Sequence, residues 1–207
     1  MGRDKALLEV GGRPLIACAA GQLQSLGITP RICGSRPDLA GFAEVIPDNH
    51  AGCGPLGGIE AALTASGTDL SLFIPVDLPN LPSAFLRWMA LRAASTEAVA
   101  TLPHCGGRAQ PLCAVYSRRL LPGLRAALAS GNYRMMEAVA AAAASLGERV
   151  DEFQVETIAA ALVPGVWPAA PPPGDWFRNL NTPADYERFC TASRNFEAGA
   201  NRRHPIS

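Results

Sequence analysis

The chain has 207 residues, of which 48% are hydrophobic and 17% charged, so it can bury a sizeable core and is not disordered throughout. Its 18 Lys and Arg residues balance 18 Asp and Glu residues, which excludes the overall positive field that nucleic-acid-binding proteins use. No apolar run approaches the roughly 20 residues that span a bilayer, and no apolar signal region follows the charged N-terminus, so we expect a cytoplasmic protein of one layered domain without nucleic-acid or membrane partners.

Short apolar runs alternate with longer segments of helical spacing along the first half of the chain, a pattern typical of α/β proteins. In chain order, the expected elements are a helix opened near Pro14 and stopped by Gly27, strands over 31–34 and 43–46, a glycine-rich loop over 54–58, a helix over 59–65 and a strand over 70–76. The last run is the most nearly continuous in its apolar character, which predicts a strand that is covered on both faces.

The second half continues the same alternation. The expected elements are a helix over 83–94, strands over 97–102 and 110–116 joined by a turn over 104–107, helices over 118–129 and 133–146, a strand over 150–155 and a final helix over 182–192. Prolines make the stretch over 164–173 an extended loop. We expect residues 1–193 to form one domain and residues 194–207 to be a disordered tail.

Two acidic residues follow predicted strands at the point where each strand ends. Asp77 comes directly after the strand over 70–76, and Asp48 follows the strand over 43–46. Ligands of open parallel sheets bind at the carboxyl ends of the strands, and one or two protein carboxylates commonly hold Mg²⁺ together with substrate phosphates. The pattern favours a metal ligand at Asp77, with turn formation or helix capping as the alternative for both acids.

Three further features are suited to phosphate groups. The loop that begins at Gly54 lets backbone amides approach an anion or the edge of a base, although it is neither a Gly-x-Gly-x-x-Gly fingerprint nor a Walker A sequence. Lys5 is the only lysine of the sequence and provides a point charge for a phosphate. Arg134 lies at the start of a predicted helix, and its guanidinium also suits phosphate. For both basic residues, a solvated surface charge is the alternative.

Asn179 and Asn181 flank Leu180 just before the last predicted helix. Alternate residues of an extended segment point to the same side, so the two amides could read the edge of a heterocycle, with turn chemistry as the alternative. The sequence contains no Gly-x-Ser-x-Gly elbow and its histidines are scattered, which disfavours nucleophilic catalysis by the protein. The cysteines and histidines also lack the spacing of a zinc site.

Seven short motifs extend over almost the whole chain. Among them are Asp4-Lys5, Ile46-x-Asp48, Gly54-Pro55-Leu56-x-Gly58, Pro75-Val76-Asp77-x-Pro79, Gln110-Pro111-Leu112 and Asn179-x-Asn181-Thr182-Pro183. In this order they resemble the molybdenum cofactor guanylyltransferases, a family of nucleotidyltransferase-like α/β domains. The segments around Lys5, Asp77 and Asn179 together are fairly specific, whereas the Gly-Pro-Leu motif also occurs in related sugar-nucleotide and cytidylyl enzymes.

The resemblance implies a three-layer α/β fold with a mostly parallel, Rossmann-like sheet of the nucleotide-diphospho-sugar transferase type. It implies Mg²⁺-dependent transfer of GMP from GTP to molybdenum-molybdopterin, with release of pyrophosphate. By similarity, Lys5 would neutralise triphosphate charge, Asp48 would help to hold the guanine nucleotide and Asp77 would bind the metal. The pterin side would be formed by Arg134, Asn179 and Asn181. Transient contacts with other proteins of molybdenum cofactor biosynthesis are also expected.

The resemblance further implies a first strand and a Leu-Ala-Gly-Gly-x-x-x-Arg-Met-Gly loop, of which this sequence contains only the final Met1-Gly2. In the family this strand lies inside the sheet. Without it, two neighbouring strands should have unpaired backbone groups, at a cost of about 1–3 kcal/mol for each buried group. We expect a misplaced start codon or a fragment, and poor GTP binding by the chain as given.

Two other functions fit the same residues. One is a cytidylyltransferase that acts on molybdopterin or on another small phosphate acceptor, which turnover of CTP would identify. The other is a non-catalytic pterin-binding protein, which pterin binding without turnover would identify.

Overall fold

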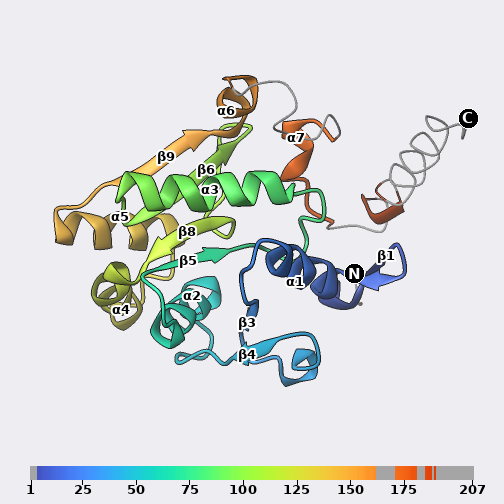
Figure 1. The fold of residues 1–207 in the computed structure, drawn as a ribbon. Coiled ribbons are helices and arrows are strands. Elements are labelled where there is room, and N and C mark those ends of the chain that lie inside the picture. Colours follow the sequence, from blue (N-terminus) through green and yellow to red (C-terminus); the bar gives the residue numbers. More distant parts are fainter. Residues whose placement is uncertain (1–3, 162–170, 181–184, 188, 190–207) are drawn as a thin grey trace, which may run out of the picture.

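A mixed β-sheet lies between two layers of helices in the computed structural model, which describes residues 4–161, 171–180, 185–187 and 189 (Figure 1). Its strands are β5 (Leu70–Phe73), β6 (Ala100–Cys105), β7 (Arg108–Ala109), β8 (Ala114–Ser117) and β9 (Val150–Gln154). β8 pairs antiparallel with β5 and β6, while β9 runs parallel to β6. The predicted α/β class is therefore confirmed, with a sheet that is mixed rather than mostly parallel because β8 returns through a hairpin.

Side chains of β8 alternate between two cores on opposite faces of this sheet. Ala114 and Tyr116 belong to one core and Val115 to the other, as the two-residue period of a strand requires. The first core is covered by α2 (Gly54–Ala65), α4 (Leu121–Ala129) and α5 (Met135–Leu146), and the second by α3 (Ser83–Thr96), α6 (Val155–Ala161) and α7 (Pro173–Trp176). None of the described helices has the length and apolar character needed to cross a membrane.

A smaller part of the fold carries the N-terminal elements. Its parallel strands are β3 (Arg31–Cys33) and β4 (Glu44–Ile46), and α1 (Leu15–Ser25) precedes them. The short elements around them are the 3₁₀ turns η1 (Lys5–Leu7) and η2 (Pro37–Leu39) and the hairpin of β1 (Glu9–Val10) with β2 (Arg13–Pro14). A small apolar cluster around Ile32 and Leu39 joins these elements.

A cavity of about 1020 Å³ separates β3 from β5. Residues 29–34 line one side and residues 70–76 the other, while side chains of α1 and α2 contribute to its remaining walls. Within the described residues, β3 pairs with β4 and β5 pairs with β8, and no ladder joins β3 to β5. We call this space the interstrand cavity. The edges of β3 and β5 that face this cavity have no ladder partner within the described residues.

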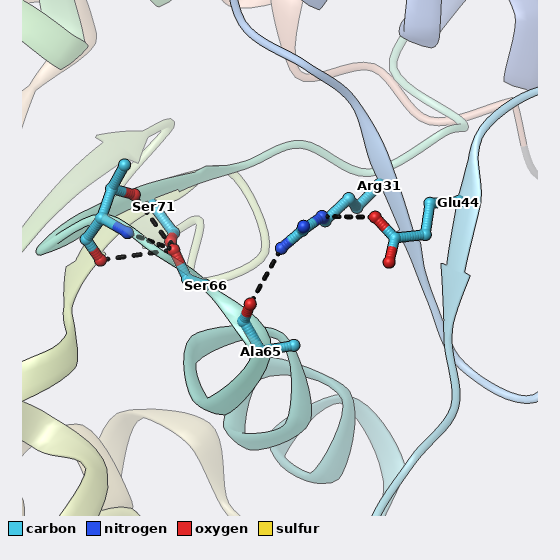
Figure 2. A network of polar contacts seen from close by, with 6 residues as sticks. Arg31, Glu44, Ala65, Ser66 and Ser71 are labelled. Atoms are coloured by element: carbon cyan, nitrogen blue, oxygen red, sulfur yellow. Dashed lines mark hydrogen bonds and ion pairs between the residues drawn. The ribbon is translucent and has the colours of Figure 1, made fainter.

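Arg31 lines the interstrand cavity and contacts both β4 and the end of α2 (Figure 2). Its Nε donates to Glu44 Oε2 at 2.8 Å, and its Nη1 donates to the carbonyl oxygen of Ala65 at 3.0 Å, at the end of α2. The next residue of that helix end, Ser66, accepts a hydrogen bond from Ser71 of β5 at 3.3 Å. The amino ends of β3 and β5 thus lie beside the same helix end, and residues that follow both strands, such as Arg36 and Val76, line the same cavity.

Most of the predicted helices and the hairpin are confirmed. Gly106 and Gly107 form the turn between β6 and β7 with φ of 57° and 72°, which non-glycine residues rarely adopt. The strand predicted over 70–76 ends at Phe73 and is half-buried, because one of its edges faces the cavity. α6 and the β1–β2 hairpin were not predicted. Most of the final helix and of the Pro-rich loop, and all of the tail over 194–207, lie outside the described residues.

We expect an apolar, strand-forming segment placed before residue 1 to stabilise the fold. Ala6 already lines the interstrand cavity, and backbone groups of β3 and β5 would gain partners worth about 1 kcal/mol each. Urea denaturation should show a higher midpoint, and hydrogen exchange should show slower amides in residues 31–33 and 70–73. A Gly/Ser segment of equal length is the control. Equal midpoints for the two extended chains would contradict the expectation.

Candidate functional site

The segments that follow the carboxyl ends of β4 and β5 both line the interstrand cavity. Asp48 lines this cavity, as do Ala6 and Val76, the chain neighbours of Lys5 and Asp77. We call the part of the fold formed by Lys5, Arg36, Asp48 and Asp77 the carboxyl rim. The fold therefore places three of the sequence-predicted site residues in or next to the lining of one cavity, although their segments are far apart in the chain.

Lys5 and Asp77 form an ion pair at the carboxyl rim. Lys5 Nζ donates to Asp77 Oδ2 at 3.3 Å, and the exposed fractions of the two side chains are 39% and 17%. Asp4 caps the η1 turn that carries Lys5, because its Oδ1 accepts a hydrogen bond from the Ala6 amide at 3.0 Å. The ammonium is thus held on a short, capped turn and remains accessible to a ligand.

The backbone of Asp77 is fixed by the C-terminal segment of the described chain. Its carbonyl oxygen accepts a hydrogen bond from the amide of Leu180 at 3.1 Å, and the Leu180 side chain is buried. Asn179, the preceding residue, is exposed, and Asn181 lies outside the described residues. Asn179 is therefore the chain neighbour of Leu180, whose backbone is hydrogen-bonded to the backbone of Asp77.

Asp48 carries a buried oxygen that no described group satisfies. Its Oδ1 has no hydrogen-bond partner within the described part of the chain. A Cβ added at Gly58 would lie 3.4 Å from that oxygen and 3.4 Å from Cys33 Cβ, so Asp48 reaches close to α2. Burial, followed by the negative charge of Asp48, raises the pKa of the Cys33 thiol to about 11. A buried acceptor without a donor is costly, and a ligand could supply that donor.

The predicted loop over 54–58 is wrong, because α2 begins at Gly54 itself. Pro55 lies in the first turn, where its fixed φ suits a helix and its missing N–H is not needed. Gly57 packs closely, since an added Cβ would lie 3.2 Å from the His50 carbonyl oxygen. Close packing thus explains the glycine at position 57, which the sequence pattern had assigned to a loop. Gly54 stays exposed, lines the cavity and offers the free amides of a helix start.

Arg134 lies on a different part of the surface. It precedes α5 with a side chain that is 79% exposed, and its Nη1 contacts Glu137 Oε1 at 2.8 Å. The hydrogen bond to Glu137 raises the pKa of Arg134. A hydrogen bond with the Cys53 thiol raises the pKa of the neighbouring Tyr133.

Arg36 is a rim residue that the sequence reasoning missed. It lines the interstrand cavity, and its side chain forms ion pairs with Asp38 and Asp4. The hydrogen bond to Asp38, followed by that to Asp4, raises the pKa of Arg36. Arg36 comes just after the predicted strand over 31–34, so the strand-end rule could have indicated it as a site residue. The sequence reasoning applied that rule only to acidic residues.

Comparisons with known proteins show the family of the chain. Residues 1–146 match the family described as MobA-like NTP transferase domain. A molybdenum cofactor guanylyltransferase of Cereibacter sphaeroides is 35% identical over 145 residues, which cover 65% of this chain and 71% of that protein. A protein of the same name from Syntrophotalea carbinolica is 28% identical over 195 residues, covering 91% of this chain and 84% of the relative.

A solved structure gives the same fold. The crystal structure of molybdopterin-guanine dinucleotide biosynthesis protein A from Archaeoglobus fulgidus matches with a TM-score of 0.70 and 20% identity, covering 94% of this chain and 92% of that chain. At this identity the likeness concerns the fold alone. It supports the nucleotidyltransferase-like α/β architecture.

We expect Asp48→Asn to leave the protein as stable as the wild type, or to raise its free energy of unfolding by about 0.5–1 kcal/mol. The substitution removes a charge whose buried oxygen has no donor in the described structure. Urea denaturation measures the difference.

Asp151→Asn is the matched control for this prediction. The Asp151 side chain is 8% exposed and accepts two hydrogen bonds from Arg92, at 2.6 and 2.8 Å. Removing its charge should cost about 3 kcal/mol. A similar loss for Asp48→Asn would mean that Asp48 has a structural role.

Proposed function

The chain belongs to the family of MobA-like NTP transferase domains and is a nucleotidyltransferase, and on that premise we propose that it transfers GMP from GTP to molybdenum-molybdopterin in a Mg²⁺-dependent reaction. Its relatives named molybdenum cofactor guanylyltransferase support the choice of donor and acceptor. Cytoplasmic location and transient contacts with other proteins of the pathway stay predictions.

The observation that carries this proposal is the ion pair of Lys5 with Asp77, next to a cavity whose lining includes Asp48. Transfer of a nucleotidyl group requires that the triphosphate is positioned and its charge neutralised, more than it requires a protein nucleophile. In our proposal, Lys5 neutralises triphosphate charge and Asp48 holds the guanine nucleotide. The terminal phosphate oxygen of the pterin substrate forms the new bond to the α-phosphorus, and the bond from that phosphorus to pyrophosphate breaks.

Asp77 fits the role of a magnesium ligand. Its carboxylate lies at the rim and is partly exposed, and the described residues contain no group of three or more His, Cys, Asp or Glu side chains that could hold a metal. A single carboxylate such as that of Asp77 suits Mg²⁺, which takes one or two protein carboxylates and completes its shell with water and phosphate oxygens. When bound, the ion would supply positive charge to the phosphates.

The remaining predicted residues would hold the two substrates. We propose that the free amides at Gly54 face the nucleotide, because Gly54 and Asp48 line the same cavity. Arg134, Asn179 and Asn181 are proposed for the pterin side. The hydrogen bond between Leu180 and Asp77 supports this proposal for Asn179, since it ties the asparagine segment to the rim.

A nucleotide panel tests the function. We expect pyrophosphate release when the chain is given GTP, Mg²⁺ and molybdenum-molybdopterin, at a higher rate than with CTP. Preferential CTP turnover would make the protein a cytidylyltransferase. Pterin binding without turnover of either nucleotide, also in a chain extended by a strand and a glycine-rich loop, would make it a binding protein.

We expect Asp77→Asn to lower turnover by about 100-fold or more, because the lost charge would both hold the metal and pair with Lys5. The assay should use the N-terminally extended chain, and near-UV circular dichroism should show an unchanged fold. Glu44→Gln is the control, since Glu44 pairs with Arg31 outside the carboxyl rim. Undiminished turnover by Asp77→Asn would remove Asp77 from the metal site.

A further inference from the structure

Glu60 is a buried carboxylate in the middle of α2. Its side chain is 2% exposed, yet both oxygens have partners. Oε1 accepts hydrogen bonds from Arg125 Nε at 2.8 Å and Thr64 Oγ1 at 2.9 Å. Oε2 accepts one from Asn49 Nδ2 at 2.9 Å. The carboxylate therefore joins α2 to α4, which carries Arg125, and to the segment that follows β4.

The Glu60 carboxyl is held in its ionised form. Burial raises its pKa, but the hydrogen bonds from Asn49, Arg125 and Thr64 outweigh burial, so that the pKa lies below its ordinary value. A buried ion pair is weak evidence for stability, because apolar residues of similar volume are often as stable in the same place. Stability alone therefore does not account for a charged side chain at this position.

The contact with Asn49 distinguishes this network from an ordinary buried ion pair. Asn49 directly follows Asp48, and its residue surface is exposed, yet its side-chain amide reaches the buried Glu60. Asp48 itself approaches the same helix at Gly58. Asp48 and Asn49, which follow β4, are thus both placed against α2, Asn49 by a hydrogen bond and Asp48 by close packing.

Asp48 needs this support because its own carboxylate has no complete set of partners. Its buried Oδ1 lacks a donor among the described residues, so hydrogen bonding at that atom does not orient it. The Asn49–Glu60 hydrogen bond is the fixed point nearest to Asp48 in the chain. If it is lost, the segment after β4 gains freedom and Asp48 can turn away from the cavity.

We propose that Glu60 is a positioning residue that acts through Asn49 to hold the Asp48 carboxylate toward the interstrand cavity, and thereby sets the affinity for the nucleotide. The part concerning affinity rests on the proposed function, which gives Asp48 its role. The part concerning position does not, and it can be tested without any nucleotide.

The main test uses Asn49→Ala in the full chain. This substitution removes the tether while leaving Glu60, Arg125 and Thr64 paired. We expect faster amide exchange in residues 48–53 and a lower unfolding midpoint, because the buried Glu60 Oε2 loses its donor. We also expect the Kd for GTP with Mg²⁺ to rise about 10-fold, as for the loss of one hydrogen bond to a charged group.

A double variant provides the rescue. Asn49→Asp combined with Glu60→Gln exchanges donor and acceptor, so that the side-chain amide at position 60 can donate to the carboxylate at position 49. Slow exchange of residues 48–53 should return. Asp151→Asn is the control, because it alters another buried carboxylate paired with arginine. It should lower the unfolding midpoint without changing exchange in residues 48–53 or the Kd for GTP.

The outcomes separate the two parts. Wild-type exchange in Asn49→Ala would overturn the proposal. Faster exchange with an unchanged Kd would also overturn it, because the segment would be positioned without consequence for the nucleotide. A wild-type chain that binds no GTP, with or without the N-terminal extension, would overturn the proposed function, while the exchange data would still decide whether Glu60 positions the segment.

Discussion

The placement of the candidate site depends on how two strands without a common ladder are held side by side. β3 and β5 lie on opposite sides of the interstrand cavity, so backbone hydrogen bonds do not set their relative position. Arg31 links β4 to the end of α2, and Ser66 links that helix end to β5 (Figure 2). Exposed ion pairs contribute little free energy. The packing of α1 and α2, which form part of the cavity walls, must therefore supply most of the support that holds β3 and β5 in place. This arrangement keeps residues that follow both strands in the lining of one cavity.

The helix α2 lines this cavity. Its end interacts with Arg31, its start at Gly54 lies near the rim, and Glu60 between them binds Asn49. A single rigid element therefore fixes the separation of β3 from β5 and the place of the acid after β4. Precise sites need such supporting contacts, since small displacements of a charged group reduce its effect strongly. The buried charge of Glu60 is understandable in these terms.

Local sequence signals predicted much of the fold, and long-range packing accounts for the errors. Gly106 and Gly107 form the expected turn because their backbone preference acts within a few residues. The strand-end rule indicated Asp77 as a site residue, since this rule depends on topology and not on side-chain detail, and the structure pairs Asp77 with Lys5 across 72 residues. Gly57 was assigned to a loop, whereas its close approach to His50 fits a helix. Arg125 and Glu60 are separated by 65 residues in the chain, and no local sequence pattern predicts such a contact.

The balance of charge at the carboxyl rim bears on the form in which a nucleotide would bind. Lys5 and Arg36 are already paired with Asp77, Asp4 and Asp38, and Asp48 adds another acid with a buried oxygen. Around this rim, within the described residues, the acids outnumber the basic side chains. The whole chain has no net charge, so no long-range field compensates for this local excess. A free triphosphate would therefore meet repulsion, whereas its complex with a divalent cation would be attracted to the carboxylates and release Lys5 toward the phosphates.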